Sequence, residues 1–164
     1  MHTEAFEWVK DAASRLPDVR TVIEIGSRNV NGTVRTLFPG RSWFGLDIED
    51  GPDVDLVVDA MEFTPAELVD MVICCEVLEH APRWKEIILR AVSWLNPGGV
   101  LLITVAGPGR DPHSAYDGGP LKHGEYYGNV SPEDLGRVAA AAGLAGMTVS
   151  TGKMVDVYYQ GWKQ

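Results

Sequence analysis

The chain has 164 residues, a net charge of −9 and 45% hydrophobic residues, so we expect a single domain over residues 1–164 with a substantial core. The acidic balance argues against nucleic acid as a partner, because binding to phosphates needs clustered Lys and Arg side chains. No apolar stretch has the length of a membrane span and the N-terminal residues lack the apolar core of a signal peptide, which predicts a cytoplasmic protein without a membrane partner.

Helices and strands are predicted to alternate along most of the chain. The N-terminal segment, residues 1–17, has apolar residues at helical spacing, with Thr3 as a candidate N-cap and Pro17 as the stop. Residues 131–143 predict a capped helix that begins at Ser131 and stops at a glycine. Further helices are predicted over 31–38 and 83–96, and strands over 20–26, 42–48, 54–61, 70–77, 100–107, 144–152 and 154–163.

This order of elements predicts an α/β fold with a largely parallel sheet, helices on both of its faces and a C-terminal hairpin. The strand over 70–77 is mostly apolar, which is typical of a strand that is covered on both sides. Its neighbouring cysteines, Cys74 and Cys75, would point to opposite faces of the sheet. They are therefore predicted to be free, buried thiols and not a disulfide or a metal site.

Acidic residues recur at or near the ends of successive predicted strands. They are Glu24, Asp47, Asp59 and Glu76. Acids are common in loops, so any one of them is weak evidence for a site. In open sheets of this kind, however, ligands bind in the crevice beyond the carboxyl ends of the strands. The coincidence of all four predicts a binding site there.

The segment after the first predicted strand resembles a nucleotide-binding turn that lacks its usual glycines. "IGSRNVNG" keeps Gly26, but Arg28 and Val30 occupy positions where dinucleotide-binding sequences carry glycine. Those glycines let the backbone approach a pyrophosphate and let the helix pack on the strand. Asp47 lies 21 residues after Gly26, close to the spacing of an acid that accepts hydrogen bonds from ribose hydroxyls. The predicted ligand is a nucleoside without phosphates, which fits S-adenosylmethionine.

From about Thr21 to its C-terminus the chain resembles the class I S-adenosylmethionine-dependent methyltransferases, of the small type 11 kind. The matching segments are "VIEIGSRNVNG", "FGLDI", "VVDAM", "DMVICCEVLEHAPRW" and "LNPGGVLLITV". The resemblance implies a Rossmann-like, seven-stranded, mostly parallel sheet with an antiparallel C-terminal strand. It also implies S-adenosylmethionine as the methyl donor and S-adenosylhomocysteine as the product.

The resemblance further implies which residues hold the cofactor. Asp59 is expected to accept a hydrogen bond from the adenine amine, with Ala60 and Met61 packed on the ring. Asn31 and Gly32 are expected to begin a helix whose N-terminus faces the cofactor carboxylate. The full predicted set is Glu24, Gly26, Ser27, Arg28, Asn31, Gly32, Asp47, Ile48, Asp59, Ala60, Met61, Glu76 and Val77.

The methyl acceptor is expected to contact the variable segments, because the sulfonium already activates the methyl group and catalysis is mostly positioning and exclusion of water. Residues 107–130 contain six glycines and three prolines and are predicted to form a substrate lid. The predicted catalytic residues are His80, His123 and Tyr127, and the predicted acceptor-binding residues are His113, Tyr116, Asp117 and Tyr126.

Metal binding by His113, Asp117 and His123 is an alternative for the lid. Their spacing matches no established metal motif, so no metal is predicted.

The sequence thus predicts a small methyltransferase. A small-molecule acceptor is expected, since no added domain or large insertion is present for recognition of nucleic acid or protein. Two alternatives come from other classes. A non-catalytic, S-adenosylmethionine-binding regulatory or partner subunit would suit the unusual first motif and the lack of an evident base. A nicotinamide-dependent oxidoreductase is disfavoured by the missing glycines.

Overall fold

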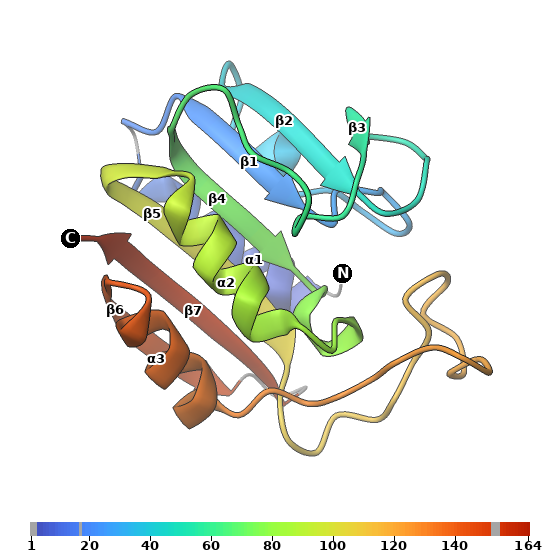
Figure 1. Cartoon of the computed structure of the whole chain (residues 1–164). Coiled ribbons are helices and arrows are strands. Elements are labelled where there is room, and N and C mark those ends of the chain that lie inside the picture. Colours follow the sequence, from blue (N-terminus) through green and yellow to red (C-terminus); the bar gives the residue numbers. More distant parts are fainter. Residues whose placement is uncertain (1–2, 17, 152–154) are drawn as a thin grey trace.

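A computed structural model describes residues 3–16, 18–151 and 155–164 and contains one seven-stranded sheet with helices on both faces (Figure 1). The elements are α1 (Thr3–Ser14), β1 (Thr21–Ile25), η1 (Arg35–Leu37), β2 (Ser42–Asp47), β3 (Leu56–Val57), β4 (Val69–Cys75), η2 (Leu78–His80), α2 (Trp84–Ser93), β5 (Leu95–Ala106), α3 (Pro132–Ala141), β6 (Leu144–Thr151) and β7 (Asp156–Lys163). The predicted helix stop at Pro17 and the strand ends at 152 and 154 lie outside the described residues.

The strand order places a crevice in the middle of the sheet. The order is β3-β2-β1-β4-β5-β7-β6, in which β1 pairs in parallel with both β2 and β4, and β7 pairs antiparallel with β5 and β6. From β1 the chain adds β2 and β3 toward one edge of the sheet, and it then adds β4, β5 and the C-terminal strands toward the other edge. The connections that follow β1 and β4 therefore lead away from each other. Ligands of such sheets bind at this switch point. The predicted fold class is confirmed.

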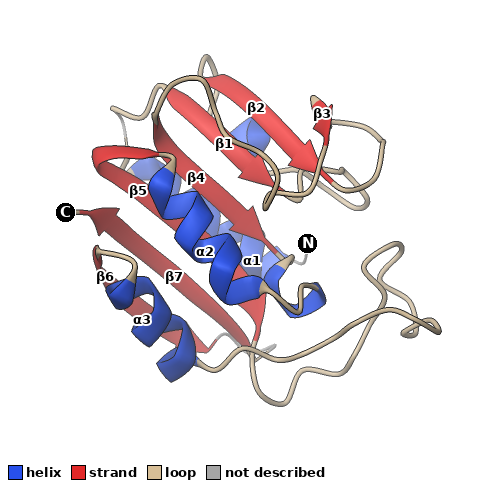
Figure 2. Cartoon of the chain, viewed as in Figure 1, coloured by secondary structure: helices blue, strands red, loops and turns tan. Residues whose placement is uncertain are grey.

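Both faces of the central strands β1 and β4 are buried, which explains their continuous apolar runs. The helices α2 and α3 lie on one face of the sheet and α1 lies on the other (Figure 2). In β4, Val72 and Cys74 belong to the cluster that includes residues of α2 and α3, whereas Met71 and Ile73 belong to the cluster that includes residues of α1. The alternation follows the two-residue period of a strand. Cys74 is buried, Cys75 packs against the opposite cluster, and both are free thiols, as predicted.

The helix α3 begins as the sequence predicts. The Ser131 hydroxyl accepts a hydrogen bond from the Asp134 backbone N–H at 3.0 Å, and Pro132 occupies the first turn. Gly143, with φ of +90°, follows the helix. These contacts satisfy backbone groups that the helix itself leaves unpaired.

Two predicted elements are corrected. Residues 31–38 form no α-helix, only the short turn η1, because Gly32 has φ of +125° and its N–H donates to the Asn29 side chain at 2.9 Å. The predicted helix N-terminus at Asn31 and Gly32 is therefore wrong. The predicted strand over 54–61 is reduced to β3, since Asp59 turns the chain by accepting a hydrogen bond from the Met61 N–H at 2.8 Å.

Residues 107–130 contain no helix or strand, in agreement with the predicted irregular segment. This segment extends from the carboxyl end of β5, beyond the ends of the parallel strands, and returns to α3 (Figure 1). Within the described ranges, no helix has the combination of length and apolarity needed to cross a membrane.

Candidate functional site

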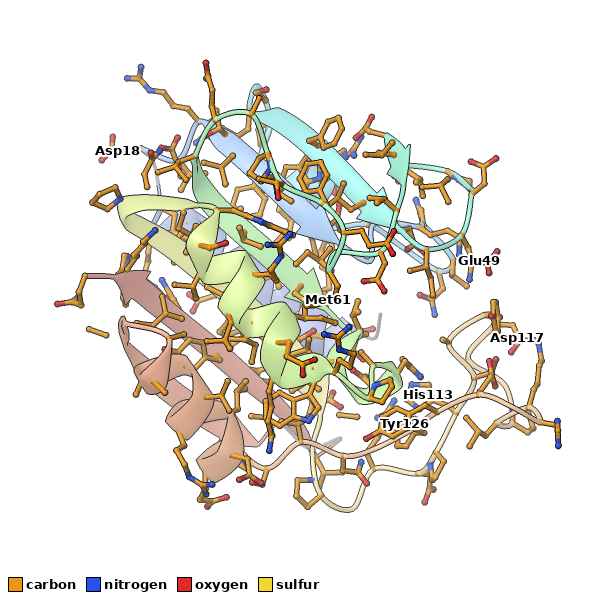
Figure 3. The ribbon with its side chains drawn as sticks, viewed as in Figure 1. Asp18, Glu49, Met61, His113, Asp117 and Tyr126 are labelled. Carbon is orange, nitrogen blue, oxygen red and sulfur yellow. The ribbon has the colours of Figure 1, made fainter. Side chains whose placement is uncertain are left out.

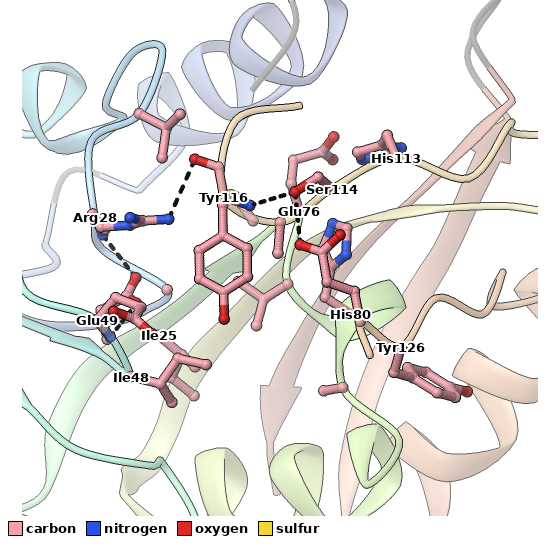
Figure 4. A pocket seen from close by; sticks show the side chains of 18 of the residues that line it. Ile25, Arg28, Ile48, Glu49, Glu76, His80, His113, Ser114, Tyr116 and Tyr126 are labelled. Atoms are coloured by element: carbon pink, nitrogen blue, oxygen red, sulfur yellow. Dashed lines mark hydrogen bonds between the residues drawn. The ribbon is translucent and has the colours of Figure 1, made fainter. Parts of the chain in front are cut away.

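A cavity of about 1310 Å³ lies at the carboxyl ends of the strands, between β1, β2 and β4 on one side and the 107–130 segment on the other. Every residue predicted to hold the cofactor lines it. Of the predicted acceptor-side residues, His80, His113, Tyr116 and Tyr126 also line it, whereas Asp117, His123 and Tyr127 do not. Figure 4 shows side chains from both sides facing this space.

The first turn depends on Gly26. Its φ is +76°, and its N–H donates to the Leu46 carbonyl at 2.8 Å. A Cβ atom at this position would lie 2.1 Å from Cγ2 of Val77, which is far inside van der Waals contact. Only glycine combines this backbone angle with such a close approach of β1 to the end of β4.

The Asp47 carboxylate is held in place by backbone groups of the turns that follow β1 and β2. Its Oδ2 accepts a hydrogen bond from the Arg28 N–H at 3.0 Å, and its Oδ1 accepts one from the Glu49 N–H at 3.0 Å. Each carboxylate oxygen has a second lone pair. The group is therefore oriented in advance and can still accept hydrogen bonds from a ligand in the cavity.

Arg28, which replaces a motif glycine, joins the first turn to the 107–130 segment. Its guanidinium donates to the Tyr116 carbonyl at 3.5 Å, and its Cζ lies 5.7 Å from the centre of the Tyr116 ring (Figure 4). A cation at this distance from an aromatic face is attracted to it. The side chain thus spans the mouth of the cavity.

Glu24 contributes a buried carboxyl group to the cavity wall. It is 5% exposed, and its Oε2 accepts a hydrogen bond from Trp43 Nε1 at 2.8 Å. Burial raises the pKa of Glu24 to about 7, against the effects of the Trp43 hydrogen bond and of nearby Arg35. A negative charge on Glu24 is therefore unfavourable unless a cation or a hydrogen-bond donor enters the cavity.

Replacing Glu24 by glutamine is expected to flatten the pH dependence of stability. Because the pKa of Glu24 is higher in the folded state than its ordinary value of 4.5, the folded chain retains this proton between pH 4.5 and 7. The wild type therefore loses stability as pH rises through this range, by on the order of 3 kcal/mol. Glutamine can still accept from Trp43, so Glu24→Gln should keep the fold without that loss.

The measurement is the free energy of unfolding in urea at pH 5 and pH 8 for both chains. Other buried acids contribute equally to both chains. The quantity to compare is therefore the change in the free energy of unfolding between pH 5 and pH 8. An equal difference in the wild type and in Glu24→Gln would show that Glu24 does not titrate in this range.

Glu76 adopts a backbone conformation that is unusual for its residue type. It has φ of +57°, its N–H donates to the Thr104 carbonyl at 2.8 Å, and its Oε1 accepts from Thr104 Oγ1 at 2.9 Å. Such angles are costly outside glycine and are concentrated at functional sites. Two hydrogen bonds to the neighbouring β5 hold the residue in this position at the floor of the cavity.

Three aromatic rings meet where η2 and the 107–130 segment come together at the cavity. The ring centres of His80, His113 and Tyr127 lie 5.0–5.4 Å apart, in edge-to-face arrangements. Burial, together with the neighbouring His113, lowers the pKa of His80 to about 4, so His80 is neutral at physiological pH. Tyr127 packs behind the two imidazoles, and burial raises its pKa to about 12.

The outer part of the segment lies away from the cavity. Asp117 is exposed and forms an ion pair with Lys122 at 2.7 Å, and His123 is also exposed (Figure 3). The open metal alternative of His113, Asp117 and His123 gains no support, because the group of potential ligands that the described residues bring together is a different one: Glu79, His80 and His113.

Several cavity residues were not predicted. Ser114 and Glu125 form a short hydrogen bond of 2.6 Å at the wall, and Glu49 lies at the mouth beside Asp47 (Figures 3 and 4). Glu79, next to His80 in η2, is fully buried and does not itself line the cavity. Nothing in the spacing of Ser114 and Glu125 marks them in the sequence. Glu79 follows a predicted strand end, but its burial depends on the turn η2.

Comparison with known proteins identifies the fold and the family. CalS10, an amino pentose methyltransferase from Micromonospora echinaspora involved in calicheamicin biosynthesis, is 17% identical, with 99% of this chain and 91% of that chain covered and a TM-score of 0.72. The sugar N-methyltransferase KedS8 from Streptoalloteichus sp ATCC 53650 is 16% identical, covering 99% and 87%, with a TM-score of 0.74.

A third similar structure is the 1,6-didemethyltoxoflavin-N1-methyltransferase of Burkholderia thailandensis, solved with 1,6-didemethyltoxoflavin and S-adenosylhomocysteine. It is 15% identical, covering 98% of this chain and 78% of that chain, with a TM-score of 0.72. No curated protein sequence matches the chain. The sequence profile of the family described as "Methyltransferase domain" matches residues 1–149. The chain therefore belongs to the methyltransferase domain family.

Proposed function

We propose that the chain transfers the methyl group of S-adenosylmethionine to a small molecule and releases S-adenosylhomocysteine. The observation that carries this proposal is the Asp47 carboxylate. It lies at the end of β2, is fixed by the N–H groups of Arg28 and Glu49, and faces the cavity across from Gly26. A carboxylate oriented in this way suits the two hydroxyls of a ribose.

The rest of the cavity fits the other parts of the cofactor. Ala60 and Met61 form an apolar wall next to Asp59, where a flat base would pack (Figure 3). The first turn lacks the glycines that a pyrophosphate requires, and Arg28 occupies one of those positions. The cavity of about 1310 Å³ exceeds the range of roughly 300–1,000 Å³ typical for single ligands. It therefore has room for a donor and an acceptor side by side.

Two observations support a small-molecule acceptor. The similar structures are an amino pentose methyltransferase, a sugar N-methyltransferase and a 1,6-didemethyltoxoflavin-N1-methyltransferase. The net charge of −9 opposes binding to nucleic acid. His80, His113, Tyr116 and Tyr126, which line the far wall of the cavity, would contact the acceptor and exclude water from the methyl transfer.

A ligand-dependent thermal unfolding experiment, followed by transfer of a labelled methyl group, tests this function. S-Adenosylmethionine and S-adenosylhomocysteine at 100 times their Kd should stabilise the chain by about 2.7 kcal/mol, which shifts Tm by several degrees. Nicotinamide dinucleotides should give no shift. Incubation with labelled S-adenosylmethionine and pooled metabolite fractions should then yield a labelled small molecule.

The two alternatives give different results. A shift with a nicotinamide dinucleotide and none with S-adenosylmethionine would indicate an oxidoreductase. A shift with S-adenosylmethionine but no labelled product from any fraction would favour the non-catalytic binding subunit.

A further inference from the structure

We propose that Glu79, His80 and His113 form a binding site for a divalent transition-metal ion in the acceptor-side wall of the cavity. Each of the three side chains offers one ligand atom, and these atoms all lie within 4.8 Å of one another. Glu79 and His80 come from the turn η2 after β4, whereas His113 comes from the 107–130 segment. The site therefore connects the rigid sheet to the irregular segment.

Buried polar atoms without partners mark the site. Glu79 is 0% exposed; its Oε1 accepts a hydrogen bond from the Ala106 N–H at 3.3 Å, but its Oε2 has no hydrogen-bond partner among the described residues. His80 Nδ1 is likewise buried without a partner in that part of the chain. Buried polar groups are normally paired. A bound metal ion that coordinates both Glu79 Oε2 and His80 Nδ1 would explain why neither atom has a hydrogen-bond partner among the described residues.

The second nitrogen of each imidazole is already engaged. His113 Nδ1 lies 3.1 Å from the Asp111 carbonyl oxygen, and as an N–H donor there it leaves Nε2 free to coordinate. The His80 ring makes a backbone hydrogen bond with Tyr126 while its Nδ1 stays unpaired. Metal-binding histidines almost always donate their other N–H to a carbonyl or carboxylate, which fixes the ring.

Coordination requires the three atoms to move closer. Metal–ligand bonds of about 2.0–2.2 Å need ligand atoms within about 4 Å of one another, and the three atoms here all lie within 4.8 Å of one another. An adjustment of no more than about 1 Å would suffice, and His113 lies in a segment without helix or strand that can supply it. Binding of the ion should therefore draw the 107–130 segment toward η2.

The ligand set indicates the class of ion. Two imidazoles and one carboxylate suit Zn²⁺, Fe²⁺, Co²⁺ or Ni²⁺, whereas Mg²⁺ and Ca²⁺ prefer oxygen ligands. Three protein ligands leave at least one position open. Since His80 and His113 line the cavity, that position would face the acceptor. On the proposed function, an acceptor hydroxyl bound there would release its proton to solvent more readily. Its oxygen would then form a bond to the methyl carbon as the bond from that carbon to sulfur breaks, and S-adenosylhomocysteine would leave.

The test is titration of the chelator-treated full chain with Co²⁺, followed by visible absorption, and with Zn²⁺, followed by calorimetry. Neither measurement uses S-adenosylmethionine, so failure of the metal site and failure of methyl transfer are distinguished. We expect one ion per chain with a roughly micromolar or lower Kd, and a loss of at least about tenfold in affinity for Glu79→Gln and for His113→Ala. Glu79→Gln preserves shape, so its fold is checked readily by circular dichroism.

The matched control removes the chain's other histidines, His2 and His123. The double variant His2→Ala/His123→Ala should keep the wild-type metal affinity. Zn²⁺ should also slow hydrogen exchange in residues 107–130 of the wild type and not of His113→Ala. Unchanged affinity in Glu79→Gln and His113→Ala, loss of binding in the double variant, or a Kd of about 1 mM or weaker in the wild type would overturn the proposal.

Discussion

Replacing Asp47 by alanine is expected to lower the affinity for S-adenosylmethionine by roughly 10- to 100-fold. A hydrogen bond from a ribose hydroxyl to a carboxylate contributes roughly 1.5–3 kcal/mol, and each 1.4 kcal/mol is a factor of ten. The structure adds a second reason. Without this carboxylate the Arg28 and Glu49 N–H groups lose their acceptor, so the first turn and the end of β2 are no longer fixed against each other. Calorimetric titration measures the affinity directly.

Two further variants separate the ribose contact from the effect on the turn. Asp47→Asn keeps one oxygen acceptor for the backbone but removes the charge, so its affinity should lie between those of wild type and Asp47→Ala. Glu49→Gln alters the neighbouring acid at the cavity mouth and should change affinity by less than threefold, as expected for an exposed charge. If Asp47→Ala folds and binds S-adenosylmethionine as tightly as the wild type, the ribose role is wrong.

Replacing Gly26 by alanine is expected to destabilise the chain by about 2–4 kcal/mol. About 1 kcal/mol comes from a side chain in the left-handed conformation, because φ is +76°. A further 1–3 kcal/mol comes from overpacking, since the new Cβ would meet Val77 Cγ2 at 2.1 Å. The same clash would push the first turn away from the cofactor site. Urea unfolding and calorimetric titration measure the two effects.

Gly40 provides a matched control. It has the same φ of +76°, and a Cβ atom there would meet no atom within 4 Å. Gly40→Ala should therefore show only the cost of the backbone angle, about 1 kcal/mol, and no change in cofactor affinity. The double variant Gly26→Ala/Val77→Ala should lose less stability than the sum of its single changes. Equal losses of stability in Gly26→Ala and Gly40→Ala would show that Gly26 is not needed for close packing between the end of β1 and Val77.

The sequence predicted the layers of the fold because two local signals mark them. Buried strands are continuously apolar, and helix starts carry capping residues. The apolar run over 70–77 indicated a strand covered on both faces, and the structure divides its side chains between two clusters. Ser131 indicated the start of α3 through a contact between residues three apart. Such features depend on neighbours in sequence, so no knowledge of the tertiary structure is needed to find them.

Elements that depend on distant partners were predicted less well. Residues 31–38 contain apolar residues at helical spacing, yet the Asn29 side chain, which donates to the distant Asp53 carboxylate at 2.9 Å, accepts a hydrogen bond from the Gly32 N–H and directs the backbone into a turn. Residues 54–61 have the composition of a strand, but as the edge of the sheet β3 pairs only with β2 over two residues. Local preference is weak compared with the hydrogen bonds and packing that the surrounding structure supplies.

For the cavity, the sequence by itself determined which strand-end residues line one wall. Glu24 and Asp47 lie at the ends of β1 and β2, and Glu76 follows β4. Parallel strands bring their carboxyl ends to one edge, so chain order alone places these residues around one cavity. Only the tertiary structure decided which residues of the 107–130 segment line the opposite wall. Residues 107–130 have no periodicity that fixes where a side chain points, and the fold turns His113 toward His80 and Glu79 while it leaves His123 in solvent. His113 is more than 30 residues away from η2 in the sequence, so packing in three dimensions sets their contact and no local spacing encodes it.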